Sequence, residues 1–471
     1  MYCGYVTTLK NVRQHPNADR MKLADCFGNT VCVGLDAAEG EIVIYFPTDG
    51  QLSAEFCAQH DLVRRKDENG NPAGGYLDPD KRNIKAIKLR GEKSDGLVMP
   101  LSCLAYIGIN LDEVNIGDQI TTVNGHEICQ KYIPRSSTRH GHYSSGNRTR
   151  KVKVPTAPLF SEHADTEQLA YNLGAFKPGD EIEITLKMHG TSQRTGYLPV
   201  LQGYKRNLWD RICRRAGTPI YDWGYVSGTR RVVLDNYEGG FYGSNAFREQ
   251  HSKTFEGKLM KGETVYYEVV GFTDTGTPIM SSASNKKLND KEFIKQYGEE
   301  TVFSYGCSPY SIEQQMVTLK QAYGTAEEAC NHIDLLKPQS DIYVYRMSLT
   351  NEDGYVVEYT PDFMRYRCEQ MGVKCVPLLW KGNIPEHPGS KDDPTITAGD
   401  WVKNLAERFY DGPDPIGKTH IREGVVVRVL NRPKFCAYKH KNFAFKVLEG
   451  IIKDCAEAPD MEESQEVENN G

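Results

Sequence analysis

The feature that most constrains the fold is a short turn near the middle of the chain, residues 187–190, with the sequence Lys-Met-His-Gly. The apolar residues Ile182, Ile184 and Leu186 alternate with polar ones before the turn, and an aromatic and apolar run follows it. Alternation with a period of two is typical of a strand with one buried face, so the segment predicts strand, tight turn, strand. The turn would hold one amine, that of Lys187.

The spacing of this turn is not sufficient by itself. A lysine three residues before a glycine also occurs at Lys88 and at Lys93. Both fall in the N-terminal quarter, within a strand and its following turn, and we interpret them as surface lysines. The residues that follow Lys187 must therefore decide its role.

Length and composition predict an ordinary globular protein of more than one domain. A chain of 471 residues is too long for one core, and two or three domains are expected. The 13 cysteines contain no Cys-x-x-Cys pair, which argues against a disulfide framework and against a zinc ribbon. No apolar stretch approaches the roughly 20 residues that span a bilayer. We expect a cytoplasmic protein without a membrane or protein partner.

The first part of the chain, residues 1–130, consists of short alternating segments broken by Gly, Asn and Asp. This pattern predicts a small, all-β barrel. Residues 131–155 follow as a linker rich in Ser and Gly, with basic residues that could lie on a phosphate backbone. Those basic residues are Lys131, Arg135, Arg139, Arg148, Arg150, Lys151 and Lys153. A second basic and aromatic stretch, residues 204–215, has the same character.

Strands and helices alternate from residue 156 to residue 453, which predicts an α+β domain of antiparallel sheets with helical insertions. The expected strands are residues 181–187, 264–272, 341–347, 354–359 and 424–430, and the expected helices are residues 291–297, 312–323, 326–335, 361–371 and 400–410. The last segment, residues 454–471, has seven acidic residues and no Lys or Arg, and we expect it to be disordered. Without it the formal charge changes from −6 to +1, so any contact with nucleic acid must come from local basic patches.

One segment, residues 412–419, satisfies the spacing of a phosphate-binding P-loop and ends in Gly417, Lys418 and Thr419. That motif requires a preceding strand and a helix that begins at its Lys-Thr end. Here a helical pattern precedes the segment and a strand pattern follows it, and Pro413 and Pro415 remove two backbone amides. We interpret the segment as a connection from a helix to a strand.

Groups that suit phosphate chemistry follow Lys187 at strand positions: Glu268, Glu423, Lys439 and Lys441. A lysine that attacks the α-phosphorus of a nucleotide forms a phosphoramidate and releases pyrophosphate, and cations must surround the reacting phosphate. Carboxylates within apolar strands are costly unless they are paired or bound to metal. Lys439 and Lys441 are two residues apart, so both point to the same face of a strand.

These blocks, in this order, resemble the motifs of the covalent nucleotidyltransferases, which include ATP-dependent DNA ligases, RNA ligases and mRNA capping enzymes. His189 stands where DNA ligases usually have Asp, a form that is similar to the RNA ligases. In the N-terminal part, residues 15–19 (His-Pro-Asn-Ala-Asp) before a strand pattern, and residues 88–91 leading into 94–99, resemble the OB-type modules that bind tRNA beside some aminoacyl-tRNA synthetases. Together with residues 162–166, this N-terminal part also resembles a bacterial and phage group of RNA ligases that seals nicks in a duplex.

The resemblance implies a role for each matching residue. Lys187 is the nucleophile that becomes adenylated, within the turn that also contains His189 and Gly190. Glu268 and Glu423 match the acids that contact the nucleoside or support divalent metal, Mg²⁺ or Mn²⁺. Arg230, with Arg231 as its alternative, matches an arginine that contacts the nucleotide or a 5′-phosphate end. Tyr345, or Tyr343 in another register, matches the aromatic that stacks on adenine, and Lys439 and Lys441 match the lysines at the α-phosphate, with Lys446 as the alternative to Lys441.

The resemblance therefore implies an ATP-dependent RNA ligase that joins a 5′-phosphate end to a 3′-hydroxyl end at nicks or breaks in RNA or in strands that contain RNA. Within the superfamily, a DNA ligase and a capping guanylyltransferase are alternatives. From a different class, the chain could be a non-catalytic RNA-binding protein whose OB-like module carries its function.

Overall fold

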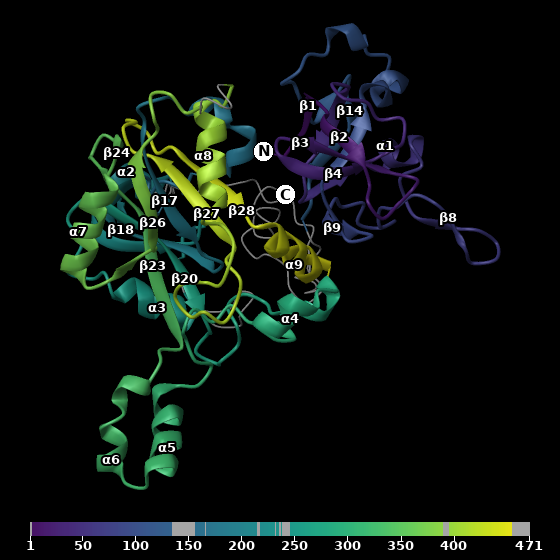
Figure 1. Ribbon diagram of the computed structural model, residues 1–471. Helices are drawn as coiled ribbons and strands as arrows, with labels where there is room; N and C mark the ends of the chain where they lie inside the picture. The colour runs from purple at the N-terminus through teal and green to yellow at the C-terminus, as the bar shows by residue number, and fades with distance from the viewer. Residues whose placement is uncertain are drawn as a thin grey trace. The chain divides into compact units, whose positions relative to one another are not determined.

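The computed structural model describes residues 2–133, 156–164, 166–213, 217–230, 232–234, 237, 245–389 and 395–454 (Figure 1). The chain divides into two compact units, the first comprising Met1–Ser136 and Phe443–Asp460 and the second centred on Ser137–Asn442. Most of the expected basic linker and acidic tail, residues 134–155 and 455–471, lies outside the described residues. None of the described helices is both long enough and apolar enough to cross a membrane.

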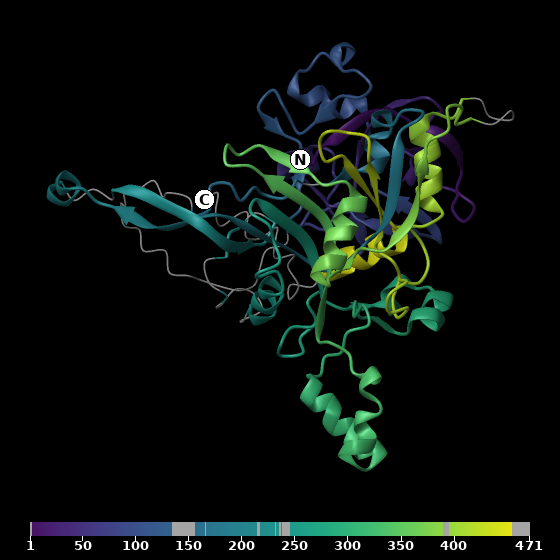
Figure 2. The same cartoon turned by 90° about the vertical axis from the view of Figure 1, so that its left-hand side faces the viewer.

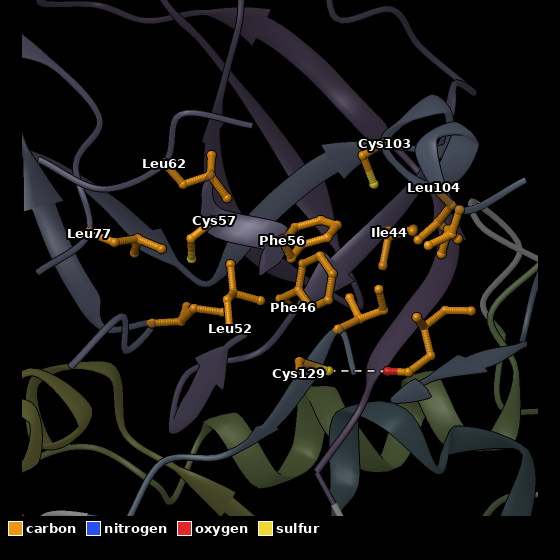
Figure 3. Close-up of a cluster of buried hydrophobic side chains, with 14 of the residues drawn as sticks. Ile44, Phe46, Leu52, Phe56, Cys57, Leu62, Leu77, Cys103, Leu104 and Cys129 are labelled. Atoms are coloured by element: carbon orange, nitrogen blue, oxygen red, sulfur yellow. Dashed lines mark hydrogen bonds between the residues drawn. The ribbon is translucent and has the colours of Figure 1, made fainter. Parts of the chain in front are cut away.

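The first unit is built on an antiparallel sheet of four strands in the order β11-β5-β1-β12. These strands are β1 (Gly4–Thr8), β5 (Ile42–Phe46), β11 (Leu97–Pro100) and β12 (Gln119–Ile120). Alternate residues of β1 and β5 face inwards, where Val6, Ile44 and Phe46 pack with Leu52 and Phe56 in one apolar cluster (Figure 3). This cluster is the core of the unit.

A second sheet of the first unit contains β2 (Lys10–Gln14), β3 (Lys22–Cys26) and β4 (Asn29–Val33), and the other strands form short antiparallel pairs. The pairs are β6 (Gly50–Leu52) with β15 (Cys129–Lys131), β7 (Arg65–Lys66) with β8 (Pro72–Gly74), β9 (Ala86–Leu89) with β10 (Glu92–Asp95), and β13 (Thr122–Val123) with β14 (His126–Glu127). The helix α1 (Ala54–Gln59) begins after the N-cap Ser53. The described strands do not close into a barrel, so the expected OB-type barrel is not confirmed. The strands are short, and β12, β13 and β14 have only two residues each. The pairing of β2 with β3 is also irregular between Lys10 and Arg13, where Asn11 has a φ of 50°.

The last helix, α9 (Phe443–Asp454), groups with the first unit, although almost all of its residues fall within the expected domain of residues 156–453. The ammonium of Lys446 lies 2.6 Å from the carboxylate of Asp95, and that of Lys93 lies 5.3 Å from the ring of Phe443. Phe445 and Leu448 are fully buried. These contacts explain why the helix belongs to the first unit.

The second unit contains two large sheets. The first has the order β16-β28-β27-β17-β26. Its strands are β16 (Glu167–Gln168), β17 (Glu181–Lys187), β26 (Leu378–Asn383), β27 (Gly424–Val429) and β28 (Ala437–Lys441). All pairs are antiparallel except that of β16 with β28. One face packs on the helix α8 (Ala398–Glu407), where Ile182, Ile184 and Val425 meet Val402 and Ala406.

The other sheet has the order β19-β18-β20-β23-β24, and β25 (Lys374–Cys375) pairs in parallel with β23. Its strands are β18 (Thr191–Lys205), β19 (Thr218–Gly228), β20 (Glu263–Gly271), β23 (Ser340–Thr350) and β24 (Val356–Glu358). The helices α3 (Ala246–Lys253) and α7 (Pro361–Met371) contribute Phe247, Met364 and Cys368 to its core. The expected domain of antiparallel sheets with helices is therefore present.

Smaller elements connect β20 to β23, where the helical insertion was expected. They are β21 (Ala283–Ser284), α4 (Lys291–Tyr297), β22 (Glu300–Thr301), α5 (Ile312–Tyr323) and α6 (Ala326–Cys330). A further short helix, α2 (Leu208–Ile212), connects β18 to β19. Figure 2 shows α5 and α6 as a pair of helices that extends away from the two sheets of the unit.

The P-loop-like segment, residues 412–419, joins α8 to β27, which confirms the helix-to-strand connection that its context predicts. Pro413 forms an isolated bridge with Ile421, and no helix begins at Lys418 or Thr419. The backbone needed for a P-loop is therefore not formed.

Candidate active site

The turn at residues 187–190 connects the two sheets of the second unit, because β17 ends at Lys187 and β18 begins at Thr191. Gly190 is required by close packing: a Cβ atom there would lie 2.4 Å from the carbonyl oxygen of Val269 and 2.8 Å from Cγ of Glu268. Its N–H donates to Oε1 of Glu268 at 3.2 Å. The glycine thus lets the turn lie directly against β20.

Sheet register places three lysines on one face. Lys187 pairs with Gly424, which in turn pairs with Lys441, and Lys439 pairs with Val426 two residues along. Residues two apart in a strand point to the same side, so Lys187, Lys439 and Lys441 share the face opposite the one that packs on α8. At Gly424, a Cβ atom would lie 2.1 Å from the carbonyl oxygen of His440, so a larger residue would force β27 and β28 apart.

Glu423 lies at the centre of this charged cluster with only 2% of its surface exposed. Its Oε1 lies 2.7 Å from Nζ of Lys187 and 3.5 Å from Nζ of Lys441, and its Oε2 lies 3.7 Å from Nδ1 of His189. A buried carboxylate is stable only when such partners compensate its charge. The cluster therefore holds the ammonium group of Lys187 beside Glu423, at the turn of residues 187–190.

A second set of contacts holds His189 from the helical insertion. The N–H of His189 donates to the hydroxyl of Tyr305 at 2.6 Å, and the ring of Phe303 meets the imidazole edge-on at 4.5 Å. Both aromatic rings also pack on His420, which is fully buried near Asp414. Burial, with the nearby Asp414, raises the pKa of Tyr305 well above its ordinary value, so the phenol stays neutral.

Arginines and aromatic rings lie together on the neighbouring sheet. The guanidinium of Arg346 lies 4.4 Å from the ring of Tyr266, forms an ion pair with Glu358, and lies 3.2 Å from Nδ1 of His163. The ring of His163 is 5.2 Å from that of Tyr345. Burial, followed by the charges of nearby arginines, lowers the pKa of His163 well below its ordinary value, so this imidazole is neutral.

The structure separates the two tyrosine candidates. The hydroxyl of Tyr345 lies 2.9 Å from Oγ of Ser192, two residues after Gly190. Tyr343 pairs with Glu268 across the strands, but its hydroxyl lies 3.4 Å from Asp341.

The arginine and lysine candidates also differ in position. Arg230 lies in the second unit, where its backbone carbonyl accepts a hydrogen bond from Arg194 at 2.5 Å, whereas Arg231 lies outside the described residues. Lys446 lies on α9, which groups with the first unit, whereas Lys441 lies on β28 of the second.

The candidate residues thus fall into three groups, and the residues within each group are in direct contact. The first joins Lys187, His189, Glu423 and Lys441; the second joins Gly190 to Glu268; the third joins Tyr345 to Ser192. Phe303, Tyr305, Arg194 and Arg346 are not among the residues that the sequence predicts for the site, and His163 enters only as part of residues 162–166. Among the missed residues, the alternation of Arg194 with Ser192 after the turn is the one pattern that could have indicated its position.

Two carboxylates, those of Glu268 and Glu423, could help to hold a divalent metal. Across the described ranges, no group of three or more His, Cys, Asp or Glu is placed to do so without other ligands. Magnesium sites that use one or two carboxylates together with substrate phosphates have this composition. The residues fit a metal that arrives with a nucleotide better than they fit a permanent metal centre.

Comparison with known proteins adds evidence about the fold. No protein-family model matches the chain, and no curated protein matches it. Solved structures of the RNA ligase of Naegleria gruberi do match. A lysine-to-alanine variant with ATP and Mn has a TM-score of 0.52 and 15% identity, and the match covers 94% of this chain and 98% of that chain.

Two further structures of that ligase match the chain to a similar extent. A lysine-to-methionine variant with AMP and Mn has a TM-score of 0.53 and 16% identity, with coverage of 94% and 98%. The ligase with PPi has a TM-score of 0.52 and 15% identity, again with coverage of 94% and 98%. At this identity the likeness concerns the fold alone: the chain has a fold similar to that of this RNA ligase over nearly its whole length.

Proposed function

We propose that the protein is an ATP-dependent RNA ligase that works through a covalent lysyl-AMP intermediate on Lys187. The observation that carries the proposal is the convergence of Lys187, Lys441 and His189 on the buried carboxylate of Glu423 at the end of β17. A single amine held among cations and carboxylates is the arrangement that nucleotidyl transfer to lysine requires. The fold of an RNA ligase supports the same assignment.

In the first step, Nζ of Lys187 attacks the α-phosphorus of ATP, an N–P bond forms, and the bond to the β-phosphate oxygen breaks with release of pyrophosphate. The amine must be neutral to attack, so Lys187 has to leave its ion pair with Glu423 and lose a proton. Lys441 lies 3.5 Å from the same carboxylate oxygen and can hold Glu423 when Lys187 moves. Lys439 and Lys441 then face the α-phosphate and stabilise its charge.

In the second step, a 5′-phosphate oxygen of the nucleic acid attacks the phosphorus of lysyl-AMP, and Lys187 leaves and takes up a proton. In the third step, a 3′-hydroxyl attacks the activated 5′-phosphate, the phosphodiester forms, and AMP leaves. A bound Mg²⁺ or Mn²⁺ would offset phosphate charge, and Glu423 and Glu268 would be its protein ligands.

The remaining assignments belong to the same proposal. Tyr345 stacks on adenine, since its ring lies against His163 and its hydroxyl meets Ser192 close to the turn. Arg230 contacts the nucleotide or the 5′-phosphate end. The first unit and the basic residues of 131–155 clamp the two ends of a nicked duplex that contains RNA, as in the nick-sealing group of RNA ligases.

Incubation with labelled ATP tests the proposal. The expected result is a protein adduct that resists acid, is released by hydroxylamine and is absent from Lys187→Ala. The matched control is Lys93→Ala, which changes the same kind of residue in a similar lysine-glycine spacing but should still form the adduct. Absence of an adduct from the native protein with every nucleotide would refute the proposal, and labelling by GTP in place of ATP would indicate a capping enzyme.

A further inference from the structure

The strands β18 and β19 extend well beyond the other strands of their sheet. Pairing of β18 with β20 ends at Gly196, whereas its pairing with β19 continues to Lys205 and Thr218. Nine residues, 197–205, therefore form a two-stranded arm whose length is about 30 Å at ~3.3 Å per residue. Figure 2 shows this arm extending from the body of the second unit, with the short helix α2 near its end.

The base of the arm is held in place by packing. The rings of Tyr197 and Tyr225 stack at 4.7 Å, and the hydroxyl of Tyr225 accepts a hydrogen bond from the N–H of Gly257 at 2.6 Å. On the same strands, Leu198 and Val226 are buried against Phe160. A two-stranded ribbon is marginally stable by itself, so these contacts explain why the arm keeps a defined direction.

The far end of the arm is exposed, aromatic and basic. Trp209 and Leu208 are each 72% exposed and Tyr204 is 40% exposed, and Lys205 and Arg206 are exposed beside them. In sequence, the stretch 202–222 contains five basic residues (Lys205, Arg206, Arg211, Arg214, Arg215) and two acidic ones (Asp210, Asp222), in a chain whose formal charge is −6. Leu208 and Trp209 are adjacent, and contiguous exposed apolar side chains with polar neighbours mark contact surfaces.

We propose that the end of this arm, Tyr204 to Trp209, is a binding surface for RNA that lies outside the catalytic site. Cations bind the phosphate backbone, and exposed aromatic rings stack on bases without strict sequence preference. The strand β18 begins directly after Gly190 and continues into the arm. The length of β18 therefore sets the distance between RNA at the end of the arm and the turn that contains Lys187. Identification of the RNA as a ligase substrate rests on the proposed function, but the binding does not.

RNA binding by the full-length protein tests this inference. Fluorescence anisotropy with a nicked RNA duplex, in EDTA and without ATP, measures affinity when no chemistry occurs. We expect Trp209→Ala to weaken binding at least fivefold, the effect of removing the partner of one stacked base. The double variant Lys205→Ala, Arg206→Ala should reduce the slope of log affinity against log salt by about one for each phosphate that is no longer neutralised.

Matched controls lie on another exposed element of the same unit. Tyr310, two residues before α5, is 61% exposed, and Lys320 is exposed on α5, so Tyr310→Ala and Lys320→Ala remove the same kinds of side chain elsewhere. A shortened arm, in which Asn-Gly replaces residues 202–220 between the paired residues Leu201 and Tyr221, keeps the packed base and should bind like the tip variants.

The outcomes separate this inference from the proposed function. Formation of the ATP adduct should be unchanged in every arm variant, and the arm-dependent affinity should persist in Lys187→Ala. Unchanged affinity and salt slope in both the tip variants and the shortened arm would overturn the inference. Loss of binding to vesicles of an anionic lipid, with RNA binding unchanged, would also overturn it and assign the arm to a membrane surface.

Discussion

At the scale of single residues, the site depends on how closely the turn at 187–190 approaches β20. Most contacts that define it join residues far apart in sequence. The pairing of Lys187 with Glu423 depends on the register of β17 with β27, and the contact of His189 with Tyr305 spans 116 positions. The charged site residues could be proposed from their order in the sequence. The residues that support them, such as Tyr305, could not.

The prediction for Gly190→Ala follows from this close approach. The added Cβ would lie 2.4 Å from the carbonyl oxygen of Val269, so the turn must move away from β20 and the hydrogen bond to Glu268 breaks. We expect adduct formation from ATP to fall at least tenfold while circular dichroism still shows a folded protein. Gly174→Ala, at a position with nothing within 4 Å and no left-handed φ, is the control. A variant with native rates of adduct formation would show that the approach is not needed.

A second prediction concerns Tyr305 as a positioning residue. Tyr305→Phe removes the hydroxyl that accepts the N–H of His189, and an unsatisfied buried donor costs about 1–3 kcal/mol. Because the turn loosens without loss of a binding group, we expect a slower maximal rate of adduct formation with little change in the ATP concentration needed for half-saturation. Tyr310→Phe serves as the control. Equal effects on rate and on half-saturation would point to a role in binding ATP.

At the scale of elements, local patterns predicted some boundaries fully. The expected helices 291–297, 312–323 and 361–371 coincide with α4, α5 and α7, since each begins after a side-chain N-cap: Asp290, Ser311 and Thr360. The helix α9 was missed because it follows β28 after the single residue Asn442, without the Gly or Pro that marks a boundary. The expected barrel is not confirmed, because alternation specifies strands and does not specify closure.

An acid-dependent contribution to stability is expected where α8 meets β28. Burial disfavours ionisation of Glu407, yet hydrogen bonds from His440 and Lys403 outweigh it and lower the pKa from 4.5 to about 2. A depressed pKa stabilises the folded state above pH 4.5, and the contribution disappears between pH 4.5 and 2. Glu407→Gln should therefore lower the free energy of unfolding by about 1–2 kcal/mol at pH 7 and much less near pH 3.

Urea unfolding at several pH values measures this difference. Glu249→Gln, which breaks an exposed pair with Lys253, is the control and should have little effect at any pH. A loss of stability for Glu407→Gln that does not depend on pH would show that the carboxylate charge is not its source.

At the scale of the whole molecule, the division into two units predicts where a core mutation acts. Phe445 on α9 is fully buried in the first unit, so Phe445→Ala should destabilise that unit by about 3–5 kcal/mol. Hydrogen exchange should show reduced protection in β9 and β10, with β17 and β27 protected as before. Val402→Ala, in the core beneath β17, should give the opposite pattern. Loss of protection throughout β17 and β27 in Phe445→Ala would contradict the assignment of α9 to the first unit.

The measurement that tests the central claim most directly is identification of the modified residue after incubation with ATP. Peptide mapping by mass spectrometry should find AMP on the peptide that contains Lys187 and on no other, and Lys187→Arg should carry none. The structure supports this site because Lys187 meets Glu423, and through it Lys441 and His189, in a buried charged cluster. AMP on a different lysine, or on Lys187→Arg, would contradict the assignment of Lys187 as the nucleophile.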